Sequence, residues 1–299
     1  MTTLFGVFLL TLLVITALAV VRARHLVVAV MLLGIFSLLL AVNFFLLDAA
    51  DVALTEAAVG AGISTVLFLG ALALMSEREH HGSSRPWLSL VVVVSAVLVV
   101  VYATFDQPRL GDPEAPVLNH VGPWYLEKTP EYVDIPNVVT AVLGSYRGYD
   151  TLGEVFVVFT AGIGVLFLLS AGPGAQNNGR RRAVAEKKIG LRDERLLHVI
   201  GQLVIPFVLL FGLYVQFHGE YGPGGGFQAG ALIAAGFILY ALIEGEQRAL
   251  EALPQGGLNF LMVGGALLYG VVGLAGILLG SNFLAYSVLA QDPVFGQKL

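Results

Sequence analysis

Three acidic side chains stand within long apolar runs or at their edges, where they could take up and release protons. Glu56 lies one to two turns inside an apolar run, and a charge near the centre of a bilayer costs about 2.5–3.5 kcal/mol on insertion scales. Asp150 and Glu154 are four residues apart on one helical face, and Arg147 precedes them by one turn. A carboxylate pair beside an arginine can hold one proton between its members and titrate jointly. These acids are candidate carriers of protons or cations.

Each acid also has a purely structural interpretation. Glu56 can occupy a shallow, hydrated position at the membrane surface. Thr151 and Glu154 match the Ser/Thr-x-x-Glu capping box, in which case they only begin a helix. Both interpretations stay open, because a capping role does not exclude proton transfer.

A glycine-rich break, FHGEYGPGGGFQAG from Phe217 to Gly230, separates two apolar runs. Proline lacks a backbone N–H and glycine permits positive φ, so the segment predicts a sharp turn followed by a new helix. His218 and Glu220 are weaker candidates for an ion entrance, since histidine titrates near neutral pH; the alternative is a solvated or capping histidine. The helix-breaking residues are Pro223, Gly224, Gly225 and Gly226.

The helix that carries Glu56 contains a cluster of small residues. Gly60 and Gly62 weaken the helix and allow another helix to approach closely. We therefore expect a π-bulge or similar irregularity around Val59–Ile63. Such a bulge would re-aim Glu56 relative to the neighbouring helix.

The composition indicates a membrane protein. Of 299 residues, 57% are hydrophobic and only 12% are charged, about half the charged fraction of a soluble domain. Cysteine is absent, which excludes disulfides, thiolate metal sites and iron–sulfur clusters. We expect no cofactor and no metal site, and no basic patch indicates nucleic acid binding. The sequence contains no nucleophile–base constellation or nucleotide motif, so we do not expect an enzyme.

The fold class that the hydrophobic pattern predicts is an all-α polytopic membrane protein. About 20 apolar residues suffice to cross a bilayer. Pro136 fits the first turn of an additional short interfacial helix. The eight expected spans are residues 4–21, 26–47, 52–75, 88–105, 151–170, 196–217, 227–243 and 259–280.

Basic residues give the orientation. Twelve of the 16 Lys and Arg lie in alternate loops, after the first, third, fifth and seventh spans. The positive-inside rule therefore places the N-terminus outside and the basic 171–195 linker in the cytoplasm. We expect a multi-pass protein of the cell inner (plasma) membrane.

The sequence PGGGFQAG, followed by a helix of small residues, resembles the signature of the MnhB/MrpB subunit of multi-subunit Na⁺/H⁺ antiporters. Members of that family have a further membrane helix after the equivalent of SNFLAYSVLAQDPVFGQKL. The resemblance therefore leads us to expect that the MnhB-like part lacks its last helix.

Two upstream stretches resemble other antiporter segments. AVGAGISTVLFLGALALM resembles the third helix of the complex I J subunit and of the related MbhD hydrogenase protein, which belongs to a hydrated proton axis. SYRGYDTLGEVF resembles MbhE, which forms the end of the large subunit MrpA. The residues that match the MbhE pattern are Tyr146, Arg147, Gly148, Tyr149, Asp150, Thr151 and Glu154.

These resemblances imply four parts. They are an MbhD-like transmembrane domain (1–110), an MbhE-like interfacial and transmembrane helix (111–172), a basic cytoplasmic linker (173–195) and an MnhB-like domain (196–299). The implied partners are MrpA/MrpD-like pumping subunits and MrpC-like and MrpE/F/G-like subunits, besides the lipid bilayer, Na⁺ and H⁺.

The resemblance implies a membrane subunit of a Na⁺/H⁺ antiporter that contributes protonatable residues to the ion path. One alternative is a membrane-arm subunit of an energy-converting hydrogenase or a complex I-like redox pump, which uses the same modules. Another is a structural scaffold whose acids only cap helices.

Overall fold

A computed structural model describes residues 2–73, 86–109, 111–170 and 195–289 of the chain. Within these ranges the regular elements are helices, without strands. The basic linker expected at 173–195 lies, apart from Arg195, outside the described residues. The all-α fold class is confirmed.

Eight helices of the described residues are long and apolar enough to cross a membrane, as the hydrophobic pattern predicted. Their ends agree with the expected spans to within a few residues. They are α1 (Thr2–Arg22), α2 (Leu26–Leu46), the run α3–η1–α4 (Ala50–Thr55, Glu56–Ile63, Ser64–Ala73), α5 (Pro86–Thr104), α8 (Gly148–Ser170), α10 (Arg195–His218), α11 (Gly226–Glu244) and α13 (Gln255–Leu278).

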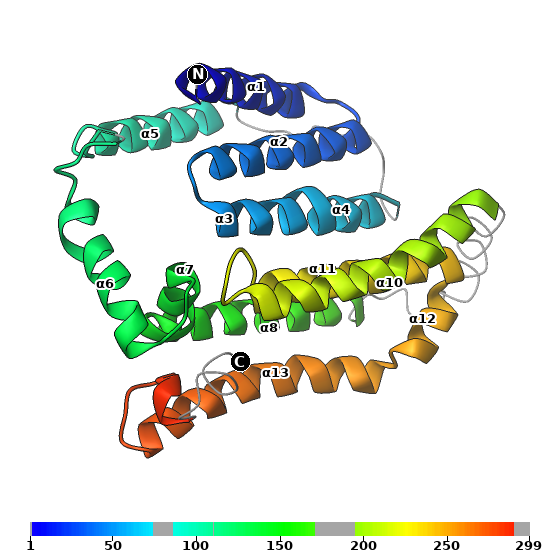
Figure 1. The fold of residues 1–299 in the computed structure, drawn as a ribbon. Helices are drawn as coiled ribbons and strands as arrows, with labels where there is room; N and C mark the ends of the chain where they lie inside the picture. The colour runs from blue at the N-terminus through cyan, green and yellow to red at the C-terminus, as the bar shows by residue number, and fades with distance from the viewer. Residues whose placement is uncertain (1, 74–85, 110, 171–194, 290–299) are drawn as a thin grey trace.

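The helices lie roughly antiparallel in a layered arrangement (Figure 1). In the N-terminal part α1 packs on α2, and α2 packs on the run α3–η1–α4. The α10–α11 hairpin joins this group because α11 contacts α3 and η1. The main helical neighbour of α8 is α13.

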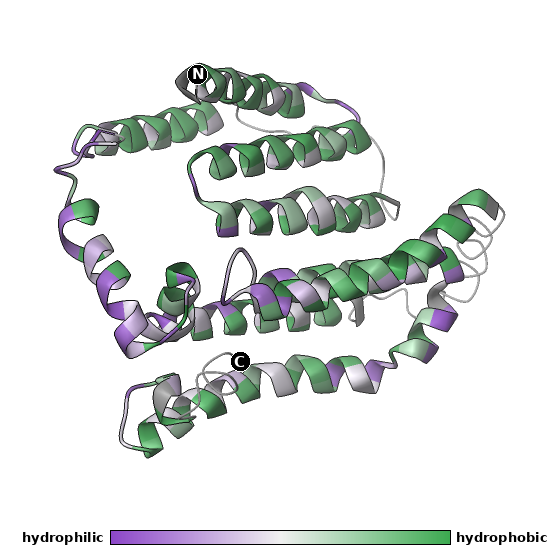
Figure 2. Cartoon of the chain, in the orientation of Figure 1, coloured by the Kyte–Doolittle hydropathy of each residue, from purple (hydrophilic) through white to green (hydrophobic). Residues whose placement is uncertain are grey.

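Apolar residues cover the long helices, and hydrophilic residues gather in the connections (Figure 2). Every described side chain from Trp87 to Thr104, along α5, is exposed within this single chain. Such an apolar surface is unfavourable in water, so it requires lipid or a partner helix around it.

Glycines with positive φ set both ends of α11. Gly225, with φ 136°, precedes its first residue, and Gly245, with φ 94°, follows its last. An L-residue with a side chain rarely adopts these angles. The turn predicted from the glycine-rich break is therefore present, and α11 begins at Gly226.

The segment between α5 and α8 contains more helix than predicted. The π-turn η2 (Val117–Val121) leads into α6 (Gly122–Tyr132), which contains Pro123 near its start and Pro130 inside. The short helix expected near Pro136 is α7 (Val138–Ala141), continued by the π-turn η3 (Val142–Tyr146). The first-turn assignment for Pro136 was wrong, because Asn137 is the N-cap and Pro136 precedes it.

Candidate functional site

The helix that carries Glu56 changes its winding at that residue. It is α-helical through Thr55 and π-helical from Glu56 to Ile63, and it then resumes as α4. The irregularity predicted around Val59–Ile63 is confirmed, and it begins three residues earlier than expected. A π-helix widens the turn, so that side chains on either side of it are rotated relative to an unbroken α-helix.

The Glu56 carboxyl group lies against Gly60 and close to α2. A Cβ added at Gly60 would collide with the Glu56 Oε1 atom and would stand 2.8 Å from the Ser37 hydroxyl oxygen. Ser37 is buried in α2, and Glu56 is half-buried. The absence of a side chain at Gly60 thus leaves the space in which this carboxyl group and the α2 hydroxyl approach each other.

Asn137 ties the N-terminal part to the glycine-rich hairpin. Its Oδ1 atom accepts from the backbone N–H groups of Val139 and Thr140, which caps α7. Its Nδ2 atom donates to the Gly222 carbonyl oxygen at 2.9 Å and the Gly219 carbonyl oxygen at 3.1 Å. A longer contact of 3.4 Å reaches Oδ1 of Asp51, in the first turn of α3.

Two further bonds join the Glu56 helix to the hairpin. The Gly224 N–H donates to the Asp51 carboxylate at 3.3 Å, and the Gln228 side chain donates to the Thr55 hydroxyl at 2.6 Å. Thr55 directly precedes Glu56. The structure therefore places Glu56 on a helix whose first turns are fixed to the start of α11.

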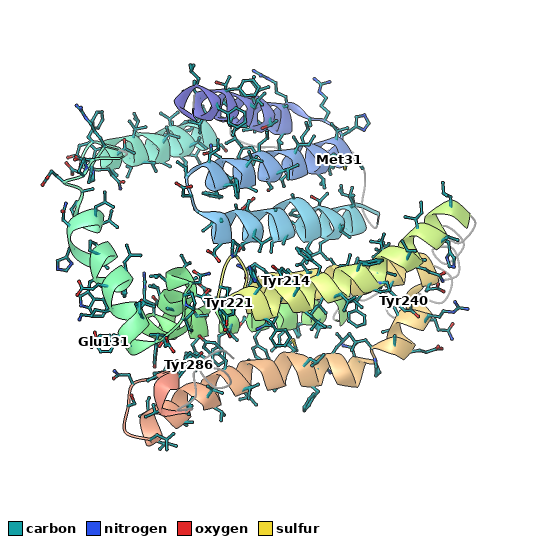
Figure 3. All side chains as sticks on the ribbon, in the orientation of Figure 1. Met31, Glu131, Tyr214, Tyr221, Tyr240 and Tyr286 are labelled. Carbon is teal, nitrogen blue, oxygen red and sulfur yellow. The ribbon has the colours of Figure 1, made fainter. Side chains whose placement is uncertain are left out.

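The hairpin residues named from the sequence lie around this junction. Glu220 is buried, with a relative exposure of 9%, and its backbone carbonyl accepts from Asn137 N–H at 2.8 Å. The His218 ring stacks on Tyr214, with centroids 4.8 Å apart. Figure 3 labels Tyr214 on α10 and Tyr221 in the turn beyond it. Gly224 packs against Val215 and Gly219 backbone, where a Cβ would clash.

Asp150 and Glu154 belong to a different place in the fold. Asp150 forms an ion pair with Arg147, at 2.5 Å from Nη2 and 2.6 Å from Nε, and both side chains are more than half exposed. The side chain of Glu154 is also exposed. Their helix α8 packs mainly on α13 and η3, so the structure does not bring these acids to the Glu56 junction.

The capping-box interpretation of Thr151 and Glu154 was wrong. Helix α8 begins at Gly148, so Thr151 lies inside its first turn rather than at its N-cap. The Thr151 hydroxyl donates to the Leu143 carbonyl at 2.8 Å, across the bend between η3 and α8. Glu154 thus has no part in starting the helix.

An aromatic pocket of about 580 Å³ lies beside the start of α8. Its wall includes Tyr146 and Tyr149 from the α8 side and Phe283 and Tyr286 from the segment after α13; Figure 3 labels Tyr286 there. Burial raises the pKa of Tyr286 above its ordinary value. The Ser145 hydroxyl donates to the buried Leu284 carbonyl at 3.0 Å and fixes the segment against η3.

Sequence reasoning missed several polar residues that the fold brings together. Asn137 had a local signal, because it follows a proline and precedes an apolar helix, but its partners lie 82 to 86 residues away. Glu244 and Arg248 had the i, i+4 spacing of an ion pair. Glu244 is buried at the end of α11, where it also contacts Gln202 of α10.

Comparisons with known proteins agree with this arrangement. Residues 196–299 match a domain related to the MnhB subunit of Na⁺/H⁺ antiporters, and residues 11–77 match the MbhD family of MBH subunits. The antiporter subunit mnhB2 of Staphylococcus aureus strain Newman is 35% identical over 106 residues, which are 35% of this chain and 74% of that protein. The same protein of strain USA300 gives the same values.

A solved structure of the Mrp complex from Dietzia sp. DQ12-45-1b contains a chain that is similar over 93% of this chain. The TM-score is 0.71 and the sequence identity is 27%. This chain spans 30% of the length of that chain. The resemblance inferred from the PGGGFQAG stretch and the MbhD-like stretch is thereby confirmed, and the chain belongs to the family of the MnhB subunit of Na⁺/H⁺ antiporters.

Proposed function

We propose that this chain acts in a multi-subunit Na⁺/H⁺ antiporter by carrying protons, or the exchanged cation, on acidic side chains between pumping modules. It is a multi-pass membrane subunit of such an antiporter, and other Mrp subunits are its partners. The family consists of transporter subunits rather than catalytic enzymes. The comparisons do not favour the alternatives of a redox-driven pump or of a scaffold.

The position of Glu56 is the main observation that supports the proposal. An acid inside a membrane helix is costly and marks ion pathways in membrane proteins. Here the acid stands at the start of a π-helix, against Gly60 and near the buried Ser37 hydroxyl. Polar side chains of this kind, with an irregular backbone beside them, can pass a proton and can adjust their position as they do so.

We assign the acids to two stations. Glu56, with His218 and Glu220 at the neighbouring hairpin, forms the first, and Asp150 with Glu154 on α8 forms the second. In the proposed division of the chain, the first station joins the MbhD-like part (1–110) to the MnhB-like part (196–299). The second belongs to the MbhE-like part (111–172), which precedes the cytoplasmic linker (173–195). In this orientation the N-terminus lies outside the plasma membrane, as the distribution of basic residues favours.

The experiment is Glu56→Gln in the assembled complex, since an amide keeps the shape of the side chain but cannot exchange a proton. We expect cation-dependent proton flux in vesicles to fall by about tenfold or more, with normal amounts of complex. Asp48→Asn is the matched control, because Asp48 is an exposed acid close to the same membrane face, and Asn tolerates its positive φ of 58°. Unchanged flux in Glu56→Gln would remove Glu56 from the path and leave the scaffold alternative.

A further inference from the structure

Three helices meet in an ionic cluster around a buried glutamate at the end of the α10–α11 hairpin opposite the glycine-rich turn. Its centre is Glu244, the last residue of α11, whose side chain is 4% exposed. Gln202 of α10 donates to Oε1 of Glu244 at 2.6 Å, and Arg248 of the short helix α12 (Glu246–Ala252) pairs with Oε2. His198 of α10 lies with Nε2 3.5 Å from Oε1.

Helix formation alone does not explain an acid at this position. The C-terminal end of a helix carries a partial negative charge, so a carboxylate there is unfavourable. Burial adds the cost of removing the carboxylate from water. Glu244 is stable because Arg248 and Gln202 supply a countercharge and a hydrogen bond, and the cluster therefore fixes α12 against the hairpin.

His198 is the histidine of this cluster, and histidine is the residue type that serves as a charge switch near neutral pH in proteins. A quarter of its side chain is exposed, while its Nδ1 atom is buried without a hydrogen-bond partner. Among the described side chains, Glu244 from α11 faces the His198 ring, and Arg248 from α12 pairs with the same carboxylate. Glu251, the next described acid of α12, is exposed.

The most exposed member of the cluster is Arg248, and the helices of the hairpin close it off on the other side. Towards the bilayer the two helices are in close contact: a Cβ at Gly212 would meet Ile233, and one at Gly236 would meet Leu209, each at 2.9 Å. Next to the cluster, Gly201 packs against Ile243. The cluster lies at the end of the hairpin towards which the C-terminal end of α1 and helix α12 also lie (Figure 1), and this end of two membrane-length helices marks one membrane face.

We propose that His198, Glu244 and Arg248 form a proton-responsive latch on this face. When His198 takes up a proton, the cluster changes from neutral to a net charge of +1, because Glu244 then faces two cations. Arg248 is half exposed and regains water when it leaves, whereas the ring of His198 is mostly buried. The carboxylate therefore stays with His198, Arg248 is released, and α12 loosens from the hairpin.

The latch goes beyond the proposed ion path, because none of its residues belongs to the two acid stations. Its effect passes to α13, since α12 is the connection between α11 and α13. Acidification of this face would thus free α13 relative to the α10–α11 hairpin.

The test uses the absence of cysteine from the chain. Ala249→Cys places a thiol at a half-buried position of α12, and Ala252→Cys places one at an exposed position of the same helix. Maleimide labelling of each is measured in the purified complex between about pH 8.5 and about pH 5.5, around the range in which histidine titrates. The ratio of the two rates cancels the pH dependence of the thiol itself.

We expect the ratio for Ala249→Cys over Ala252→Cys to rise several-fold as the pH falls. In His198→Gln, which keeps a donor towards Glu244 but cannot titrate, the ratio should be low at every pH. In Arg248→Gln it should be high at every pH, because the latch is already open. A flat ratio in the native background, an equal rise in His198→Gln, or a low ratio in Arg248→Gln would each overturn the proposal.

The labelling is measured without an ion gradient, so its outcome is independent of transport. Failure of the latch would leave the proposed function standing, and loss of function in Glu56→Gln would not alter the ratio. The two proposals are therefore tested separately.

Discussion

The side-chain oxygen of Glu56 occupies the space that a methyl group would fill at Gly60, one turn further along the same π-helix. This contact also faces the Ser37 hydroxyl of α2. The Glu56 carboxyl group can therefore take this position only because residue 60 is glycine. A single carbon atom added at residue 60 should displace the carboxyl group.

Gly60→Ala tests that relationship. We expect the added Cβ to push the Glu56 carboxyl away from Ser37, at a cost of about 1–3 kcal/mol for overpacking, and to reduce flux without changing any titratable group. Gly62→Ala is the matched control, since a Cβ there would meet only the Ala57 carbonyl oxygen, at an ordinary 3.5 Å. Thermal unfolding of the complex and antiport in vesicles are the two measurements. Equal effects of the two substitutions would mean that the Glu56–Gly60 contact is unimportant.

Glu154→Gln tests the second acid station. Because Thr151 does not cap α8, the substitution should leave the helix intact. We expect flux to fall by about tenfold or more, because an amide cannot titrate, while the amount of complex stays normal. Glu114→Gln, at an exposed acid between α5 and α6, serves as the control. Native flux in Glu154→Gln would remove this residue from the path.

Two substitutions of Asn137 compare the loss of its N-cap with the effect of a carboxylate at its contact with the hairpin. Asn137→Asp keeps an N-cap acceptor for Val139 and Thr140, whereas Asn137→Ala loses the cap, which costs about 0.5–2 kcal/mol. Both lose the bonds to Gly219 and Gly222, and the Asp variant also places a second carboxylate beside Asp51. We expect Asn137→Asp to lower the unfolding temperature of the complex more than Asn137→Ala, because its added carboxylate faces Asp51 and the carbonyl oxygens of Gly219 and Gly222. The opposite order would show that the lost cap costs more than this repulsion.

The membrane orientation is tested with two exposed positions at opposite ends of α11. Cysteines introduced at Tyr221, in the hairpin, and at Ala252, on α12, are both accessible within the chain. An impermeant maleimide should label Tyr221→Cys from the outside of intact cells and Ala252→Cys only after the membrane is opened. Labelling of both from one side would contradict the orientation inferred from the basic residues.

Sequence periodicity and length predicted the helices well because apolar helices of membrane length depend on local composition. The α10 span expected at 196–217 differs from Arg195–His218 by one residue at each end. The small-residue cluster likewise predicted the π-helix after Glu56. Helix α6 was missed because Pro123 and Pro130 interrupt a weakly hydrophobic stretch, which indicates a loop in a local pattern.

The polar contacts of the candidate site could not be predicted in the same way. Asn137 reaches Gly222 and Asp51 only because helices distant in sequence pack together. The Glu244–Arg248 pair could be predicted from its i, i+4 spacing, but the burial of Glu244 against α10 depends on the tertiary fold. Local patterns thus identify residues that can titrate, and packing decides which of them meet.

The bonds from Asp51 and Asn137 to the hairpin have a consequence for assembly. Asp51 and Gly224, which share one of these bonds, lie on segments that match two different subunit families, yet here they belong to one polypeptide. The contact is therefore intramolecular, and its occupancy depends on the effective concentration that the connecting chain imposes rather than on the expression level of two proteins. The two modules are consequently present in equal numbers in every complex, and dilution cannot separate them.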